Sequence, residues 1–214
     1  HSSGSSNNGM AYIVLANSLV EGEAISIDEA AYRFGGAHGD DYAGKAVASA
    51  GDVDGDGKPD ILIGSPYNDD YKGSSGAAYL VTAANFPDSG EVFDLKESDF
   101  IFSCPWGSCQ ATGHEGNSMA GLGDMDGDGL DDFMIGAYAS EHTGGTDPGS
   151  AHIIYSSSLW NTGWDINLRY YDARLTGESY NDWLGLDAIR SAGDVDGDGK
   201  EDIIIGFREN DSNG

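Results

Sequence analysis

Three loops of the chain concentrate carboxylates at one spacing. They read GDVDGDGKPDILIG at 51–64, GDMDGDGLDDFMIG at 123–136 and GDVDGDGKEDIIIG at 193–206, with Asp at loop positions 1, 3, 5 and 9 and Gly at positions 4 and 6. Such closely spaced carboxylates repel one another unless a cation offsets their charge. The glycines let the chain curl so that alternate side chains converge on one point. Oxygen ligands in an irregular loop suit Ca²⁺, which accepts about 6–8 oxygens, better than the strictly octahedral Mg²⁺.

We therefore predict one calcium site in each loop. Position 7 has no useful side-chain oxygen, so its backbone carbonyl is the expected additional ligand. An EF-hand is excluded, because position 12 is Ile63, Ile135 or Ile205 where that motif requires Glu. Solvated Asp-Gly turns are the alternative, which the threefold repetition disfavours. The predicted ligands are Asp52, Asp54, Asp56, Lys58 and Asp60, then Asp124, Asp126, Asp128, Leu130 and Asp132, then Asp194, Asp196, Asp198, Lys200 and Asp202.

The loops belong to a longer internal repeat. Their first aspartates lie 72 and 70 residues apart, and a glycine-led apolar segment recurs as GAAYLVTAA at 76–84, GSAHIIYSS at 149–157 and GMAYIVLAN at 9–17. Helical periodicity is weak, and the apolar runs are short, rich in Ile, Val, Tyr and Phe, and bounded by Gly, Asp, Asn and Ser. Each period therefore predicts four short strands, A to D, which is the composition of a β-propeller blade. The predicted fold class is all-β, with about three repeats of four antiparallel strands.

The phrase GDxDGDGxxDxxIG, followed by a glycine-led apolar strand, resembles the FG-GAP repeat of integrin α-subunit β-propellers. Similar repeats occur in secreted lectin-like and other extracellular propellers. The resemblance covers almost the whole chain, although the Phe-Gly and Gly-Ala-Pro landmarks are altered, the second to Gly64-Ser65-Pro66 in the first copy. It implies a propeller whose calcium loops join strands A and B, and a role in adhesion or recognition.

The repeat pattern also predicts how a single propeller region spanning residues 1–214 is divided. Closed propellers typically have about 4–8 blades, more than this chain supplies. The chain is therefore either a piece of a longer propeller or a unit whose open halves pair between copies, which we favour because open strand edges are hazardous. In such an assembly Tyr12, Ile13, Val14 and Leu15 would be buried. The predicted units are strands C and D of a split blade at 9–41, full blades at 42–114 and 115–182, and strands A and B of a split blade at 183–214.

Charge and motif content narrow the function classes. The chain has 10 Lys and Arg against 37 Asp and Glu, a formal net charge of −27, which argues against nucleic acid and anionic membrane surfaces. No apolar run approaches the roughly 18 residues of a membrane span. Nucleophile elbow, Walker, HExxH and dinucleotide motifs are absent from the sequence, so we expect a binding protein and not an enzyme. We expect an extracellular or secreted module for adhesion, recognition or assembly, with a secreted lectin-like propeller as the alternative.

Several residues outside the loops are further candidates. Cys104 and Cys109 enclose a short segment and are either two thiols or, as we expect outside the cell, a local disulfide. Asn210 begins an N-x-S sequon and is a possible glycosylation site. His38 and His114 precede strand A and are weaker site candidates. Aromatic residues that either pack between blades or bind a protein or glycan ligand are Trp106, Trp160, Trp164, Trp183, Tyr67 and Tyr71.

Overall fold

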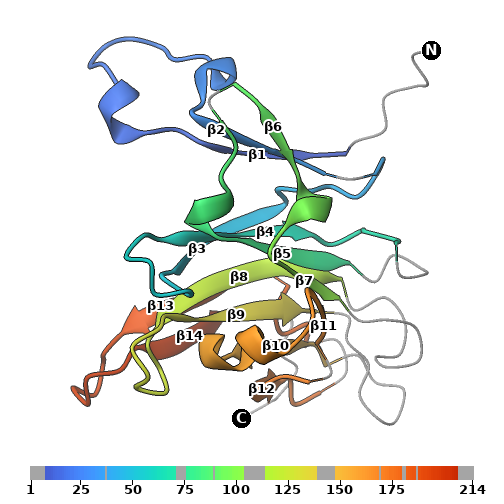
Figure 1. Ribbon diagram of the computed structural model, residues 1–214. Coiled ribbons are helices and arrows are strands. Elements are labelled where there is room, and N and C mark those ends of the chain that lie inside the picture. Colours follow the sequence, from blue (N-terminus) through green and yellow to red (C-terminus); the bar gives the residue numbers. More distant parts are fainter. Residues whose placement is uncertain are drawn as a thin grey trace.

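The computed structural model describes residues 8–36, 38–70, 76–88, 90–103, 114–138, 148–168, 170–179, 182–186 and 188–206. Within them the chain forms fourteen strands and five short 3-10 helices and no α-helix, so the predicted all-β class is confirmed. The sheets follow one another along the molecule without closing into a ring (Figure 1). The 3-10 helices are η1 (Ala16–Ser18), η2 (Ile27–Glu29), η3 (Ala83–Asn85), η4 (Leu95–Glu97) and η5 (Ser156–Asn161).

The two central sheets have the strand order of a propeller blade. In the first, β3 (Ala46–Gly51), β4 (Asp60–Ser65), β5 (Ala77–Val81) and β7 (Phe100–Ser103) pair antiparallel in chain order. Every residue of β5 is buried, as expected for a central strand covered on both faces. This arrangement places the Asp loop between β3 and β4.

The second central sheet repeats this arrangement. It consists of β8 (Glu115–Gly123), β9 (Asp132–Ala137), β10 (Ser150–Ile154) and β12 (Ala173–Thr176), again paired antiparallel in chain order. A third copy of the first two strands, β13 (Ala188–Gly193) and β14 (Asp202–Gly206), forms a sheet of its own.

At the other end of the molecule, β1 (Met10–Ile13) pairs antiparallel with β2 (Tyr32–Gly35). The sequence did not predict β6 (Val92–Asp94), which adds to β2 in parallel, nor β11 (Asp165–Asn167), which adds to β7 in parallel. Each of these strands crosses from its own sheet to the outer strand of the preceding one. Both strands are short and show no repeating apolar pattern in the sequence, so sequence reasoning misses them. Their backbone N–H and C=O groups still require hydrogen-bond partners, which the outer strand of the preceding sheet supplies.

Neighbouring sheets pack face to face through apolar side chains. Phe102 and Phe133 meet at a centroid distance of 5.4 Å in an edge-to-face arrangement, inside a cluster that also contains Leu62 and Met119. The sheets approach so closely that a side-chain carbon on Gly64 would collide with the backbone of Gly116. Glycine is thus required where two backbones cross.

Candidate metal centres

A β-bulge leads into each Asp loop. The register of the β3–β4 pair shifts between Ser49 and Gly51, and Gly51 has a φ of 85°. The corresponding shifts involve Gly123 at a φ of 63° and Gly193 at 74°. Left-handed backbone of this kind is open to glycine without strain. The bulge turns the chain out of the sheet, and it explains why glycine directly precedes the first aspartate of every loop.

In each loop, the carboxylates of the first two aspartates accept hydrogen bonds from backbone N–H groups of the same loop. In the first loop, the carboxylate of Asp52 accepts hydrogen bonds from the backbone N–H groups of Gly55 at 2.8 Å and Gly57 at 2.9 Å. Asp54 accepts from the N–H of Asp56 at 3.0 Å. The same contacts recur in the other two loops. The loop is therefore pre-organised by its own backbone, with the carboxylates on the inside.

The ninth position ties the loop to its sheet. Asp60 is fully buried at the start of β4, and its two oxygens accept hydrogen bonds from Val53 N–H at 2.9 Å and Ala83 N–H at 2.8 Å. The pKa of Asp60 is raised to about 6, mainly by burial and also by the negative charges of Asp54 and Asp56, against the lowering effect of the two N–H donors. A carboxylate held in this way at neutral pH favours a nearby cation.

In each loop, carboxylate oxygens of positions 1, 3 and 9 lie within 4.8 Å of one another. Two oxygens bound to one Ca²⁺ at about 2.3–2.6 Å can lie at most about 5.2 Å apart, so the three groups fit a shared calcium ion. The position 5 aspartates are not part of these groups; Asp56 instead pairs with Lys58 at 3.1 Å, whose hydrogen bond lowers the pKa of Asp56. The three groups are Asp52, Asp54 and Asp60; Asp124, Asp126 and Asp132; and Asp194, Asp196 and Asp202.

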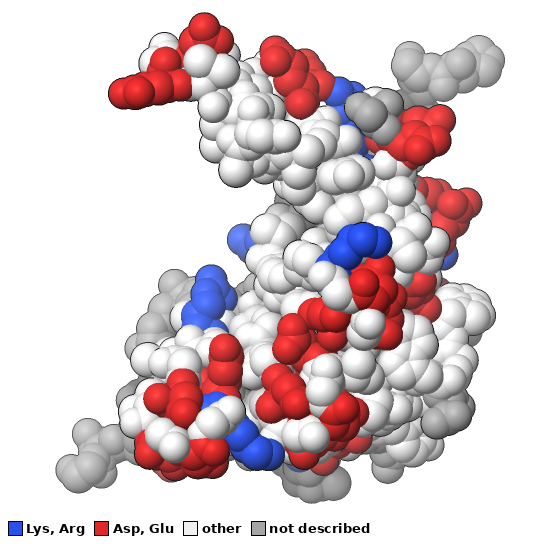
Figure 2. All heavy atoms as spheres, turned by 60° about the vertical axis from the view of Figure 1, so that its left-hand side comes forward, with Lys and Arg blue, Asp and Glu red and all other residues white. Residues whose placement is uncertain are grey.

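Adjacent loops are linked to one another. Asp131, next to the ninth position of the second loop, accepts a hydrogen bond from Asp52 N–H at 2.8 Å and donates its own N–H to Asp52 O at 3.0 Å. Lys200 of the third loop contacts the carbonyl of Met125 in the second. Figure 2 shows Asp and Glu gathered in patches on one face of the molecule, with few Lys and Arg among them. Adjacent Asp loops are thus joined by direct hydrogen bonds.

Aromatic residues gather at the opposite end of the strands. Tyr42 and Tyr67 have ring centroids 5.3 Å apart, His114 lies 5.0 Å from Tyr67, and Tyr138 stacks on His114 at 5.0 Å with an interplanar angle of 6°. Tyr67 follows the end of β4, whereas the Asp loop precedes its beginning. This row of four rings, which we call the aromatic row, therefore lies on the face away from the loops.

One positional signal in the sequence could have revealed the aromatic row. Tyr42, His114 and Trp183 stand at the same place in successive repeats, and all three have left-handed backbone, with φ of 57°, 49° and 51°. A residue other than glycine is strained in the left-handed backbone region. Its recurrence at three aromatic residues therefore indicates a structural element common to the internal repeats. The sequence predicted His114 and Trp183 separately, but not the alignment or Tyr42.

The remaining sequence candidates fall in three groups. His38 pairs with Asp70 at 2.7 Å. Trp160 and Trp164 are exposed, whereas Trp183 is half-buried. Cys104, Cys109, Asn210, Trp106 and Tyr71 lie outside the described residues, so the disulfide and the glycan stay predictions.

Comparisons with known proteins agree with the repeat pattern. Residues 43–81 match the model of the FG-GAP repeat. The chain is 31% identical to integrin alpha-5 of Xenopus laevis over 179 residues, which is 82% of this chain and 15% of that protein. It is 28% identical to integrin alpha pat-2 of Caenorhabditis briggsae over 168 residues, 77% of this chain and 13% of that protein. Identity to integrin alpha-PS2 of Drosophila melanogaster is 27% over 177 residues, 80% of this chain and 12% of that protein.

The sheets and loops therefore define a β-propeller architecture. One segment matches the FG-GAP repeat and the chain is similar to integrin alpha chains over most of its length, which confirms the resemblance drawn from the Asp loops. It spans only a small part of these relatives. In the part of the chain that the structure describes, no helix has the length and apolarity needed to cross a membrane.

Proposed function

We propose that this chain is a calcium-stabilised β-propeller module for adhesion or recognition outside the cell, and that it binds ligands without catalysing a reaction. The observation that carries the proposal is the threefold recurrence of one arrangement, in which carboxylate oxygens of positions 1, 3 and 9 lie within 4.8 Å. The similarity to integrin alpha chains supports the adhesion-type role and the extracellular location.

The stabilising effect follows from the contacts of Asp60. A bound calcium ion would supply the positive charge that offsets the three carboxylates. Asp60 joins the loop at Val53 to the start of η3 at Ala83, so keeping it ionised and oriented holds two connections of the blade together. Asp132 makes the same pair of contacts, to Met125 and Ser156, and its pKa is likewise raised by burial.

Calcium titration by isothermal calorimetry tests the proposal. We expect three sites in the intact protein and two in the Asp60→Asn variant, because that substitution removes one of the three clustered carboxylates. Asp88→Asn serves as the matched control, since Asp88 is an exposed acid outside the loops, and it should retain three sites. No calcium-dependent heat at millimolar calcium would refute the proposed function.

The second part of the proposal concerns blades and self-association. We assign full blades to residues 42–114 and 115–182, and halves of a split blade to 9–41 and 183–214. The supporting observation is that, among described residues, β1 pairs only with β2 and β14 only with β13, leaving one edge of each sheet open. The split blade would be completed by a neighbouring chain.

A lectin-like activity is the second candidate, and the aromatic row favours it. Beside the row, a hollow of about 550 Å³ is lined by Tyr42 and Tyr67 together with Asp40, Lys45 and Asp69. Exposed rings flanked by carboxylates and an amine can stack on sugar rings and bond their hydroxyls, and the same surface can anchor a protein partner. Glycan-array binding that Tyr67→Ala abolishes would support a glycan ligand. Absence of glycan binding by the intact protein would leave a protein ligand.

A further inference from the structure

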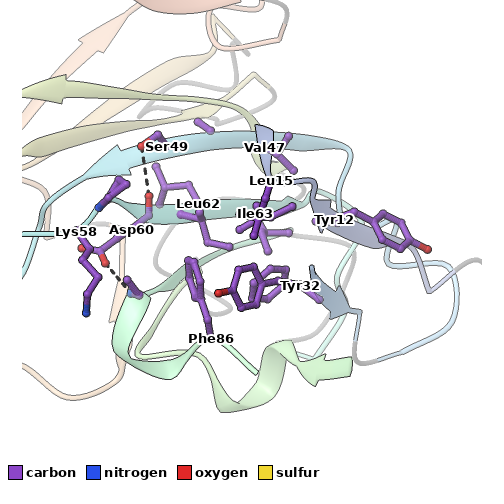
Figure 3. A pocket seen from close by; sticks show the side chains of 17 residues that line it. Tyr12, Leu15, Tyr32, Val47, Ser49, Lys58, Asp60, Leu62, Ile63 and Phe86 are labelled. Carbon is purple, nitrogen blue, oxygen red and sulfur yellow. Dashed lines mark hydrogen bonds between the residues drawn. The ribbon is translucent and has the colours of Figure 1, made fainter. Parts of the chain in front are cut away.

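Two hollows of different character border β3. The larger, of about 820 Å³, is mainly apolar, and Figure 3 shows Tyr12, Val47 and Phe86 among the side chains that line it. The smaller, of about 220 Å³, shares Val47 with the larger one but no Asp or Glu is among its lining residues in the described part of the chain. We call it the basic hollow, after its charged and polar lining residues Lys45, Asn117, Ser118 and Arg190.

The basic hollow is built by the first strands of three successive repeats. Lys45 directly precedes β3, Asn117 belongs to β8 and Arg190 belongs to β13. Among the described residues, each of these strands pairs with another strand on one side alone, so its second edge is open. Backbone N–H groups at an open sheet edge can form a concave site for an anion. The position of the hollow therefore suits a negatively charged ligand.

The two basic side chains of the hollow have no acidic partner in the part of the chain that the structure describes. The ion pairs found there involve other residues than Lys45 and Arg190. This is unexpected in a chain with 37 Asp and Glu against 10 Lys and Arg. Two like charges that face one hollow repel each other unless an anion lies between them. The charge distribution thus favours an anionic ligand at this place.

Side-chain donors remain available in the hollow. Arg190 Nη1 donates to the carbonyl of Ile189 at 2.7 Å, which orients the guanidinium and leaves further N–H groups for a ligand. Asn117 Nδ2 donates one N–H to the carbonyl of Leu186 and keeps a second. Charge-assisted hydrogen bonds from Lys and Arg to an oxyanion are stronger than those between neutral groups.

The wall behind these donors is held in place by the fold. Ser118 and Met119 are almost fully buried, and Ser118 Oγ donates to the carbonyl of Gly185 at 2.6 Å. Met119 packs in the apolar cluster between the two central sheets. A wall fixed in this way loses little conformational freedom when a ligand binds, which favours affinity.

The size of the hollow limits the ligand. Its volume of about 220 Å³ lies below the roughly 300–1,000 Å³ of pockets for drug-sized organic molecules. A sulfate-sized group fits such a space, either as a free ion or as a substituent of a larger molecule that remains outside. Amine, guanidinium and amide donors without carboxylates suit an oxyanion and disfavour a metal cation.

We infer that the basic hollow binds a small oxyanion, with Lys45 and Arg190 supplying the positive charge and Asn117 a directed hydrogen bond. No loop aspartate lines the hollow, so the site is separate from the proposed calcium sites and goes beyond the proposed function. A bound anion would also link the first strands of three repeats, because its partners come from all three.

Calorimetric titration with sodium sulfate at constant ionic strength tests the inference. We expect saturable binding of one sulfate per chain. Lys45→Met and Arg190→Met should each weaken binding about ten-fold or more, because each removes a charge-assisted hydrogen bond, and the chain with both substitutions should show no saturable binding. Lys96→Met is the matched control: it makes the same change of charge at an exposed residue outside the hollow, and its affinity should equal that of the intact protein.

Three results would overturn the site: no saturable sulfate binding by the intact protein, undiminished affinity in either single variant, or an equal loss of affinity in Lys96→Met. Lys45 and Arg190 are exposed, so unchanged melting temperatures will show that the variants fold. A separate calcium titration keeps the claims apart, since sulfate binding without calcium binding refutes only the calcium claim, and the reverse refutes only the anion site. A sulfated disaccharide used in place of sulfate identifies the source of the anion: tighter binding assigns the site to an anionic glycan, and weaker binding assigns it to a free ion.

Discussion

His152 provides a test of the packing within the second central sheet. Its side chain is almost fully buried on β10, Ser150 Oγ lies 3.0 Å from Nε2, and Nδ1 has no hydrogen-bond partner among the described residues. Burial, together with the smaller effect of the charge of Arg174, lowers the pKa of His152 to about 3. The native protein therefore keeps this imidazole neutral throughout the range where an exposed histidine titrates.

The sign and size of the pH effect follow from this pKa. The unfolded chain binds a proton at about pH 6.5, whereas the native state binds it only near pH 3, so stability is lost as pH falls below 6.5. Between pH 7 and pH 5 only the unfolded chain gains the proton. Linkage then gives a loss of about 2 kcal/mol of unfolding free energy from this one residue.

Urea denaturation of the intact protein and His152→Gln in EDTA isolates this contribution. Other groups, including Asp60 with its raised pKa, titrate equally in both proteins and cancel in the difference. The stability difference between the two proteins should change by about 2 kcal/mol, in favour of the variant, from pH 7 to pH 5. Ser150→Ala is the control, because it removes the hydroxyl but keeps the imidazole, and its pH profile should follow the intact protein. Parallel profiles for the intact protein and His152→Gln would refute the reasoning.

Three further predictions concern the loops, the sheet contacts and the open edge. Asp126→Ala should reduce the calcium stoichiometry from three to two, measured by calorimetry, and an unchanged count would remove Asp126 from the ligand set. Gly64→Ala should destabilise the protein by about 1–3 kcal/mol in urea, because the methyl group collides with Gly116, whereas Gly163→Ala, with open space around it, should be near neutral. Ile13→Asp should abolish association in sedimentation while all three calcium sites remain; an assembly that persists would contradict completion of the split blade by a neighbouring chain.

The sequence predicts the repeated parts of the structure well. In each repeat a glycine before the first aspartate marks the end of one strand, and an ILIG-type apolar run after the ninth aspartate marks the next strand. These two signals place β3, β4, β8, β9, β13 and β14. The burial of Asp60 was not predicted. Its two backbone partners, Val53 and Ala83, lie on different sides of β4 in the chain, and no local pattern links them.

Other features depend on neighbouring repeats and were missed for that reason. The parallel strands β6 and β11 are only three residues long, and each is stabilised by the outer strand of another sheet. The aromatic row arises because Tyr42 and His114, which occupy the same position in two successive repeats, flank the same Tyr67. Predicting such contacts requires an alignment of the repeats with one another, because the strand propensity of each segment does not indicate which neighbouring repeat it touches.

The calcium dependence of thermal stability tests the central claim most directly. With dissociation constants of about 10⁻⁴–10⁻³ M, 10 mM calcium contributes about 1.4–2.7 kcal/mol for each occupied site. Three sites together correspond to a rise in melting temperature of about 10–30 °C for a chain of this size. Differential scanning calorimetry in 10 mM calcium and in EDTA should show this rise, and equal melting temperatures in the two conditions would contradict the calcium-stabilised propeller.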